Sequence, residues 1–131
     1  MAIPDPYNEE VRARFENPVH AGDVEGDYAE VVVAEVAESR HGARLVLYAG
    51  VNDGKIAALR FRVRGCPHLV AAADAVCEGL EGQSPGRLAE VSASELMTRL
   101  AVPTSKTGRI LLIEDAARAL LESMGESAPG N

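Results

Sequence analysis

The sequence predicts an α+β domain: an antiparallel three-stranded sheet with helices packed on one face. Segments 43–51 and 56–64 have the composition of strands, and Asn52-Asp53-Gly54 between them tolerates the positive φ of a hairpin turn. The strand candidates precede most of the predicted helices, an order typical of α+β proteins. The chain has 131 residues, 47% of them hydrophobic, which is enough for a single domain over 1–131.

The first element is predicted to be a helix. Tyr7, Val11 and Phe15 recur at every fourth position, as on one side of a helix. Asp5-Pro6 suits the cap and first turn, and Asn17-Pro18 would end the helix.

Three strands are predicted next. Residues 28–36 are rich in β-branched side chains, which favour extended structure. In 56–64, Phe61 and Val63 alternate with arginines, so we expect one buried and one solvated face. The arginine row is either simply solvated or a docking face for an acidic partner, and it consists of Arg60, Arg62 and Arg64.

The rest of the chain is predicted to be mostly helical. Gly65-Cys66-Pro67 breaks the last strand and starts a helix to about Leu80, because proline suits a first helical turn. The buried face of this helix is predicted to be Leu69, Val70, Ala73, Val76, Cys77 and Leu80. A short turn at 86–89 precedes a capping box, 92–95, that opens a helix through Leu100.

The C-terminal part is predicted to be a loop and a long helix. Residues 102–106 form the loop, and the helix runs over 108–124 until Gly125 stops it. We expect residues 1–5 and 126–131 to be frayed.

Composition excludes several classes of function. Twenty acidic and thirteen basic residues give a net charge of −7, which disfavours nucleic-acid binding. No apolar stretch approaches the roughly 20 residues of a transmembrane helix, and no secretory signal is visible. Cys66 and Cys77 would lie about 16 Å apart along one helix, too far for a disulfide. We therefore expect a cytoplasmic protein with reduced thiols, away from membranes.

Three segments carry a family resemblance. Residues 7–22 are similar to an opening helix followed by an Asn-Pro-x-Asn-x-Gly loop, with His20 in place of the second Asn. Residues 51–66 match a strand pair that passes through Arg-Phe into a Gly-Cys turn, and 106–121 match the spacing of a Lys-x-x-Cys-x-x-x-x-Glu-Asp-Ala segment. Over 7–121 the chain thus resembles the iron–sulfur cluster assembly scaffold family of the IscU type, also found as the N-terminal domain of NifU.

The resemblance implies that most ligand positions have changed. The family holds its cluster with three cysteines, assisted by an Asp and a His. By position, His41 stands for the first Cys and Ala43 for the Asp, whereas Cys66 is retained. Gly108 replaces the His and Arg109 the third Cys, so two of the three ligand cysteines are missing.

The remaining donors form an incomplete site. A [2Fe–2S] cluster normally takes four protein donors, among which His can replace Cys. His41 and Cys66 are the candidate ligands, and His68 is a further one. Arg109 cannot ligate, and its charge would lower the pKa of Cys66. The cargo would be an iron–sulfur cluster, iron or zinc, bound weakly or shared with a partner, or none at all.

Each candidate also has a simpler structural interpretation. Cys66 is a metal ligand or persulfide acceptor, or else a small apolar thiol. His41 is a ligand or a surface histidine, and the structural role is favoured for His68, His20 and Arg109. Cys77 is expected in the core. A hydrolytic pair of Cys66 and His41 ranks last, because no orienting group or oxyanion motif accompanies it.

The resemblance implies a non-enzymatic scaffold-like protein that serves iron–sulfur assembly. Partners would be a cysteine desulfurase or other assembly proteins, and the docking loop, with Pro103 and Lys106, would correspond to a chaperone-binding segment. The alternative is a cluster-free paralogue that acts as a protein-binding adaptor. In either case we expect Cys66, His41 and Arg109 to converge at one end of the molecule.

Overall fold

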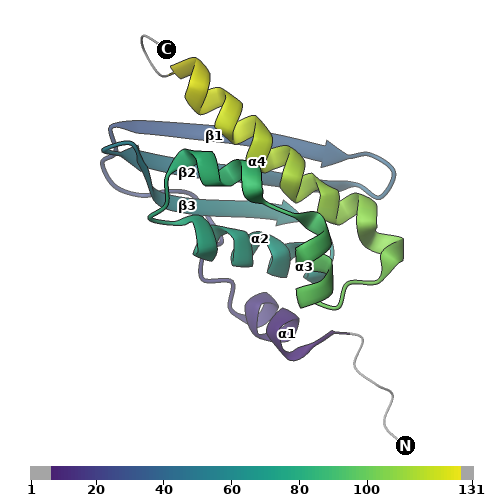
Figure 1. The fold of residues 1–131 in the computed structure, drawn as a ribbon. Coiled ribbons are helices and arrows are strands. Elements are labelled where there is room, and N and C mark those ends of the chain that lie inside the picture. Colours follow the sequence, from purple (N-terminus) through teal and green to yellow (C-terminus); the bar gives the residue numbers. More distant parts are fainter. Residues whose placement is uncertain (1–6, 128–131) are drawn as a thin grey trace, which may run out of the picture.

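The computed structural model describes residues 7–127 and has the predicted architecture (Figure 1). Three antiparallel strands pair in the order β1-β2-β3, and the helices gather on one side of the sheet, which α4 crosses. The predicted α+β fold is confirmed. The elements are α1 (Glu9–Glu16), β1 (Glu30–Glu38), β2 (Ala43–Asn52), β3 (Lys55–Arg64), α2 (Pro67–Leu80), η1 (Pro85–Glu90), α3 (Ala93–Arg99), η2 (Thr104–Lys106) and α4 (Thr107–Ser127).

The hairpin between β2 and β3 sets the register of the sheet. Asn52 pairs with Lys55, which leaves Asp53 and Gly54 as a two-residue turn. Their φ values of 52° and 71° are left-handed, as a tight hairpin turn requires. The turn chemistry therefore predicted this connection correctly.

The core lies between the inner face of the sheet and the helices. α2 packs on β3, whereas α4 packs on β1 and β2. Phe61 on β3 is buried as predicted, but Val63 is only partly buried near the end of the strand. Fully buried large side chains from both layers include Leu45, Leu47, Ile56, Leu69, Ile113 and Leu120.

Several predicted boundaries differ from the structure. α1 begins at Glu9, because the Asn8 side chain accepts the Val11 N–H at 2.9 Å and caps the helix. The expected cap at residues 5–6 lies outside the described residues. Phe15 was predicted on the apolar side of this helix, but it is 48% exposed.

The C-terminal prediction needs two corrections. Residues 104–106 form a short 3₁₀ helix rather than a loop. α4 continues through Gly125 to Ser127, so Gly125 does not end it, since glycine can remain helical at modest cost. The fraying expected for residues 126 and 127 stays a prediction. The frayed segments expected at 1–5 and 128–131 lie outside the described residues.

Ionic and backbone contacts tie the N-terminal segment to the rest of the fold. Arg14 of α1 contacts Asp74 of α2 at 2.7 Å, and Asp74 is almost completely buried. The same carboxylate accepts the His20 N–H at 2.9 Å. Beside it, Phe61 donates its N–H to the His20 carbonyl, so residues 20–22 extend the sheet at the β3 edge.

Gly50 has a packing role on the opposite, outer face of the sheet. A Cβ there would lie 2.6 Å from Cγ of Tyr28, whose ring covers this glycine. Cγ is at the root of the ring, so the tyrosine could not simply rotate its far end away.

We therefore expect Gly50→Ala to lower the free energy of unfolding by about 1–3 kcal/mol through overpacking. Urea unfolding of Gly50→Ala, Tyr28→Ala and the double variant would measure this. The double variant should lose less than the sum of the two single changes, because the clash disappears with the ring. Additive losses would contradict the contact.

Candidate thiol site

Cys66 lies where β3 ends and α2 begins. It is the N-cap residue of α2 in an extended conformation, with Pro67 at the first helical position. Its carbonyl accepts the N–H groups of Leu69 and Val70 at 3.1 and 3.2 Å, so the backbone at this junction is fixed. The thiol itself is partly buried. The local sequence thus presents a thiol at the positive end of a 14-residue helix.

The end of η2 and the first turn of α4 bring two cations, Lys106 and Arg109, to this thiol. Burial acts to raise the pKa of Cys66, but hydrogen bonding from the Leu69 N–H, the charge of Lys106, the Arg109 side chain and the His68 N–H outweigh it. The pKa of Cys66 is therefore lowered. A negatively charged sulfur is the state that this environment favours.

Lys106 also holds His68 in one protonation state. Its Nζ lies 2.9 Å from His68 Nδ1, and Tyr7 packs on the imidazole with ring centroids 4.8 Å apart. An ammonium only donates, so Nδ1 accepts and the neutral ring carries its proton on Nε2. Burial, together with the Lys106 charge, lowers the pKa of His68. A direct ligand role for His68 would require it to leave this contact.

His41 lies in the turn between β1 and β2. Because Arg44 pairs with Arg64, this turn is at the same end of the sheet as Cys66. The exposed His41 ring contacts Glu38, with Nδ1 to Oε2 at 2.9 Å, and its backbone N–H bonds the same oxygen. Thus Arg109 interacts with the Cys66 thiol, whereas His41 contacts the Glu38 carboxylate instead.

The donor set around Cys66 is too small for a complete cluster. Within residues 7–127, no group of three or more His, Cys, Asp or Glu side chains gathers into a metal site. Arg109 stands at the thiol, and an arginine supplies charge but no lone pair for a metal. Further donors would have to come from another molecule.

The two candidate residues of the docking loop have different environments. Pro103 is exposed and caps η2, whereas Lys106 is partly buried against Tyr7 and His68. Sequence analysis missed this Lys106–His68 contact, because 38 residues separate the two and no motif links them. Whether the loop binds a chaperone remains a prediction.

Cys77 has the opposite environment. It is fully buried on α2, as predicted, and burial raises its pKa, with Asp74 and Glu81 adding to the effect. The two cysteines of this chain therefore differ in access and in the direction in which their surroundings shift the thiol pKa.

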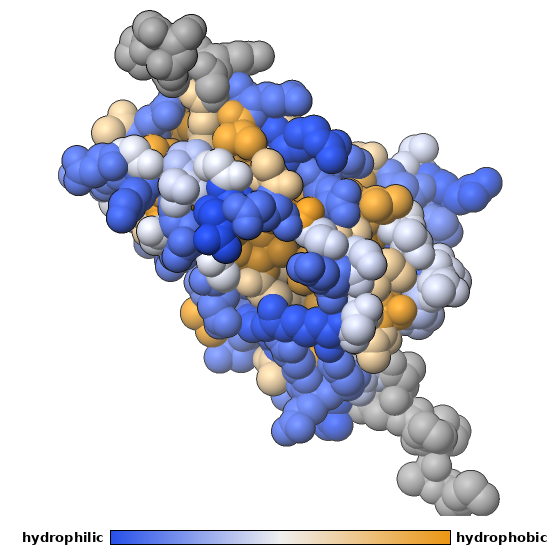
Figure 2. All heavy atoms as spheres, viewed as in Figure 1, coloured by the Kyte–Doolittle hydropathy of each residue, from blue (hydrophilic) through white to orange (hydrophobic). Residues whose placement is uncertain are grey.

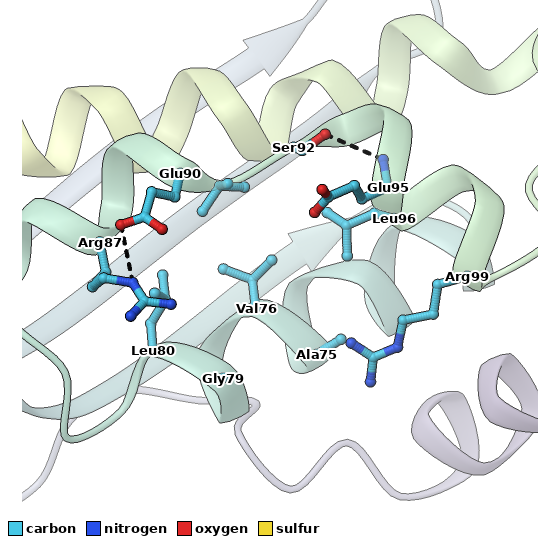
Figure 3. A pocket seen from close by; sticks show the side chains of 11 residues that line it. Ala75, Val76, Gly79, Leu80, Arg87, Glu90, Ser92, Glu95, Leu96 and Arg99 are labelled. Carbon is cyan, nitrogen blue, oxygen red and sulfur yellow. Dashed lines mark hydrogen bonds and ion pairs between the residues drawn. The ribbon is translucent and has the colours of Figure 1, made fainter.

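A groove on the helix side has different chemistry. It has a volume of about 400 Å³ and lies between α2, η1 and α3. Figure 3 shows its apolar floor at Val76 and Leu80 and the ion pair of Arg87 with Glu90 at its rim. Figure 2 shows this apolar area ringed by hydrophilic residues. It contains neither cysteine nor histidine and is separate from the thiol site.

Comparison with known proteins identifies the family. The sequence model of the NifU-like N-terminal domain family matches residues 6–126. The chain belongs to this family. It is similar to the iron-sulfur cluster assembly scaffold protein IscU of Escherichia coli K12, with 28% identity over 116 residues that cover 88% of this chain and 91% of the relative.

Solved structures agree on the fold. A NifU-like N-terminal protein from Brucella abortus superposes with a TM-score of 0.70 at 17% identity, covering 92% of this chain and 95% of that one. A putative scaffold protein for the SUF system from Fervidobacterium islandicum AW-1 gives 0.57 at 16% identity, with coverages of 92% and 95%. None of the helices in residues 7–127 is both long and apolar enough to cross a membrane.

The environment of Cys66 predicts a thiol that alkylates at lower pH than an ordinary cysteine. Lys106→Ala should move the midpoint of its iodoacetamide pH profile upward, because a positive charge is lost beside the thiolate. Lys55→Ala removes the same charge at the hairpin and should leave the profile unchanged. Mass spectrometry of the labelled peptides would also follow Cys77, which should react only on unfolding. Equal shifts in both lysine variants would contradict the local effect.

The lowered pKa of His68 predicts that the protein loses stability in mild acid. The unfolded chain binds the proton first, since its histidine pKa is near 6.5 and the folded pKa is lower. The contribution of neutral His68 to the free energy of unfolding should be complete above about pH 6.5. It should decrease as the pH falls from about 6.5 toward the pKa of the folded state. Urea unfolding across this range should show a weaker dependence in His68→Gln. The paired carboxylates Glu10, Glu78 and Glu81 have lowered pKa values and act near pH 4.5 and below. A wild-type stability that stays constant down to pH 5 would refute the His68 effect.

Proposed function

We propose that this protein serves iron–sulfur cluster assembly as a scaffold-like protein that acts through Cys66. The observation that carries the proposal is a thiol at the start of α2 whose surroundings favour the thiolate. Family membership supports the process, because the E. coli relative is an iron-sulfur cluster assembly scaffold protein. The cargo is an iron–sulfur cluster, iron or zinc.

The incomplete donor set means that the cargo is shared with a partner. Cys66 supplies one thiolate, and His41, at the same end of the sheet, is the candidate second donor once its ring leaves Glu38. A cysteine desulfurase or another assembly protein would supply the remaining donors. The protein itself would be a carrier rather than an enzyme, and would work in the cytoplasm.

Sulfur handling is a second candidate role for the same thiol. Arg109 stands where the family has a third cysteine, and with Lys106 it places two positive charges beside Cys66. Such charges stabilise an anionic sulfur, including a terminal persulfide sulfur, without providing a metal ligand. A cluster-free adaptor role remains the alternative if neither iron nor sulfur binds.

Anaerobic reconstitution with iron and sulfide tests the proposal. We expect weak, substoichiometric iron with visible charge-transfer absorption in the wild type, loss of both in Cys66→Ala and a reduction in His41→Ala. Cys77→Ala is the matched control and should keep them, because that thiol is buried in the core.

The alternatives give different results in the same experiment. Tight iron binding that survives Cys66→Ala would refute the proposed site. A protein that stays colourless and free of iron, yet carries labile sulfur on Cys66 after exposure to a desulfurase and cysteine, would favour sulfur handling. Absence of both would leave the adaptor.

A further inference from the structure

The outer face of the sheet combines exposed aliphatic side chains with unneutralised positive charge. The helices pack on the other face, so among residues 7–127 no helix layer covers this one, although Tyr28 covers it at Gly50. Val31 and Val33 of β1 are 53% and 49% exposed. Register places Val33 beside Tyr48 on β2, and Val46 beside Arg62 on β3. One continuous surface therefore crosses all three strands.

Positive charge is concentrated at the Cys66 end of this face. Arg44 and Arg64 are direct cross-strand neighbours, although like charges in such positions repel. Arg44 is neutralised by Glu35, and Arg60 is neutralised by Glu81. Arg62 and Arg64 are exposed and have no carboxylate partner among the described residues.

Tyr48 lies on the central strand of this surface and contacts Arg62. The Arg62 guanidinium lies 6.0 Å from the centre of its ring, a cation–π arrangement that holds the arginine against the sheet. A hollow of about 320 Å³ is lined here by residues that include Glu35, Arg44, Tyr48, Arg62 and Arg64. Tyrosine and arginine beside aliphatic residues are the composition typical of protein interfaces.

The charge of this face is opposite to that of the whole chain. The protein has a net charge of −7, and yet two exposed arginines on this face, Arg62 and Arg64, have no carboxylate partner among the described residues. Nucleic acid fits poorly, because it is bound by broad basic surfaces, whereas most of this face is aliphatic or neutralised. A protein segment with carboxylates and aliphatic side chains matches both components.

We propose that this outer face, defined by Val31, Val33, Val46, Tyr48, Arg62 and Arg64, docks an acidic segment of a partner protein. Carboxylates of the partner pair with Arg62 and Arg64, and its aliphatic side chains cover the valines. Because Arg64 directly precedes the Gly65-Cys66 junction, the charged end of the face positions the partner beside the thiol. The docking itself needs neither metal nor reactive Cys66, so it stands or falls independently of the assembly role.

A short peptide of mixed glutamates and valines is a suitable probe, with a lysine-for-glutamate peptide as its control. In ¹H–¹⁵N NMR titrations of the full chain, shifts should concentrate on the outer residues of the three strands and weaken with added salt. Arg62→Glu/Arg64→Glu should reduce the affinity by about tenfold or more, since two attractive charges become repulsive. Arg87→Glu/Arg118→Glu makes the same change in net charge at exposed arginines elsewhere and should bind like the wild type.

Other outcomes would overturn the proposal. One is an equal loss of peptide affinity in the Arg62/Arg64 and Arg87/Arg118 double variants. The others are NMR shifts concentrated on the helices, or equal affinities for the glutamate and lysine peptides. Tighter binding of single-stranded oligodeoxythymidylate through the same residues would mean a nucleic-acid surface. A concentration-dependent dimer in sedimentation equilibrium, abolished by Arg62→Glu/Arg64→Glu, would make a second copy of this chain the occupant. Arg62→Gln/Arg64→Gln, compared with Arg87→Gln/Arg118→Gln, decides the question if charge reversal impairs folding.

Discussion

The sheet is covered by helices on one face only, and this constraint organises the rest of the molecule. β2 alternates buried leucines with more exposed residues, so its inner side has to be covered, and α4 packs on it while α2 covers the neighbouring β3. Covering that side brings the junction of η2 and α4 to the beginning of α2. Lys106 and Arg109 thereby reach the thiol of Cys66. The same packing leaves the opposite face free for the arginines of β3.

Local signals were sufficient for most of the fold. Asp53-Gly54 specifies its turn through backbone conformation, and the Gly-Cys-Pro junction specifies the end of β3 and the start of α2. The alternation along β3 predicted the burial of Phe61 correctly. It failed for Val63, which is only partly buried although its cross-strand neighbour Leu45 is fully buried, because alternation along one strand does not say how far the helices cover that strand.

The site was less predictable, because its contacts join residues distant in sequence. Arg109 was placed near Cys66 only through family resemblance, and the structure brings the two together. The contacts of Lys106 with His68, across 38 residues, and of Arg14 with Asp74, across 60, have no local signature. Arg60 was expected among the solvated arginines, but it pairs with Glu81 at the end of α2. Such residues come into contact only when the helices have packed on the sheet and on each other.

The attachment of α1 differs in kind from that of the other helices. Val11 is its one buried side chain among the described residues, whereas Arg14 forms ionic contacts with Glu10, Asp74 and Glu78. A helix held mainly by charge can separate from an intact core, as a cooperative unit of low local stability. Its amides should then exchange with solvent faster than those of α2 or α4. Opening of this unit would also separate Arg14 from the Asp74 carboxylate. Docking of α1 therefore supplies the cation that balances a buried negative charge of α2.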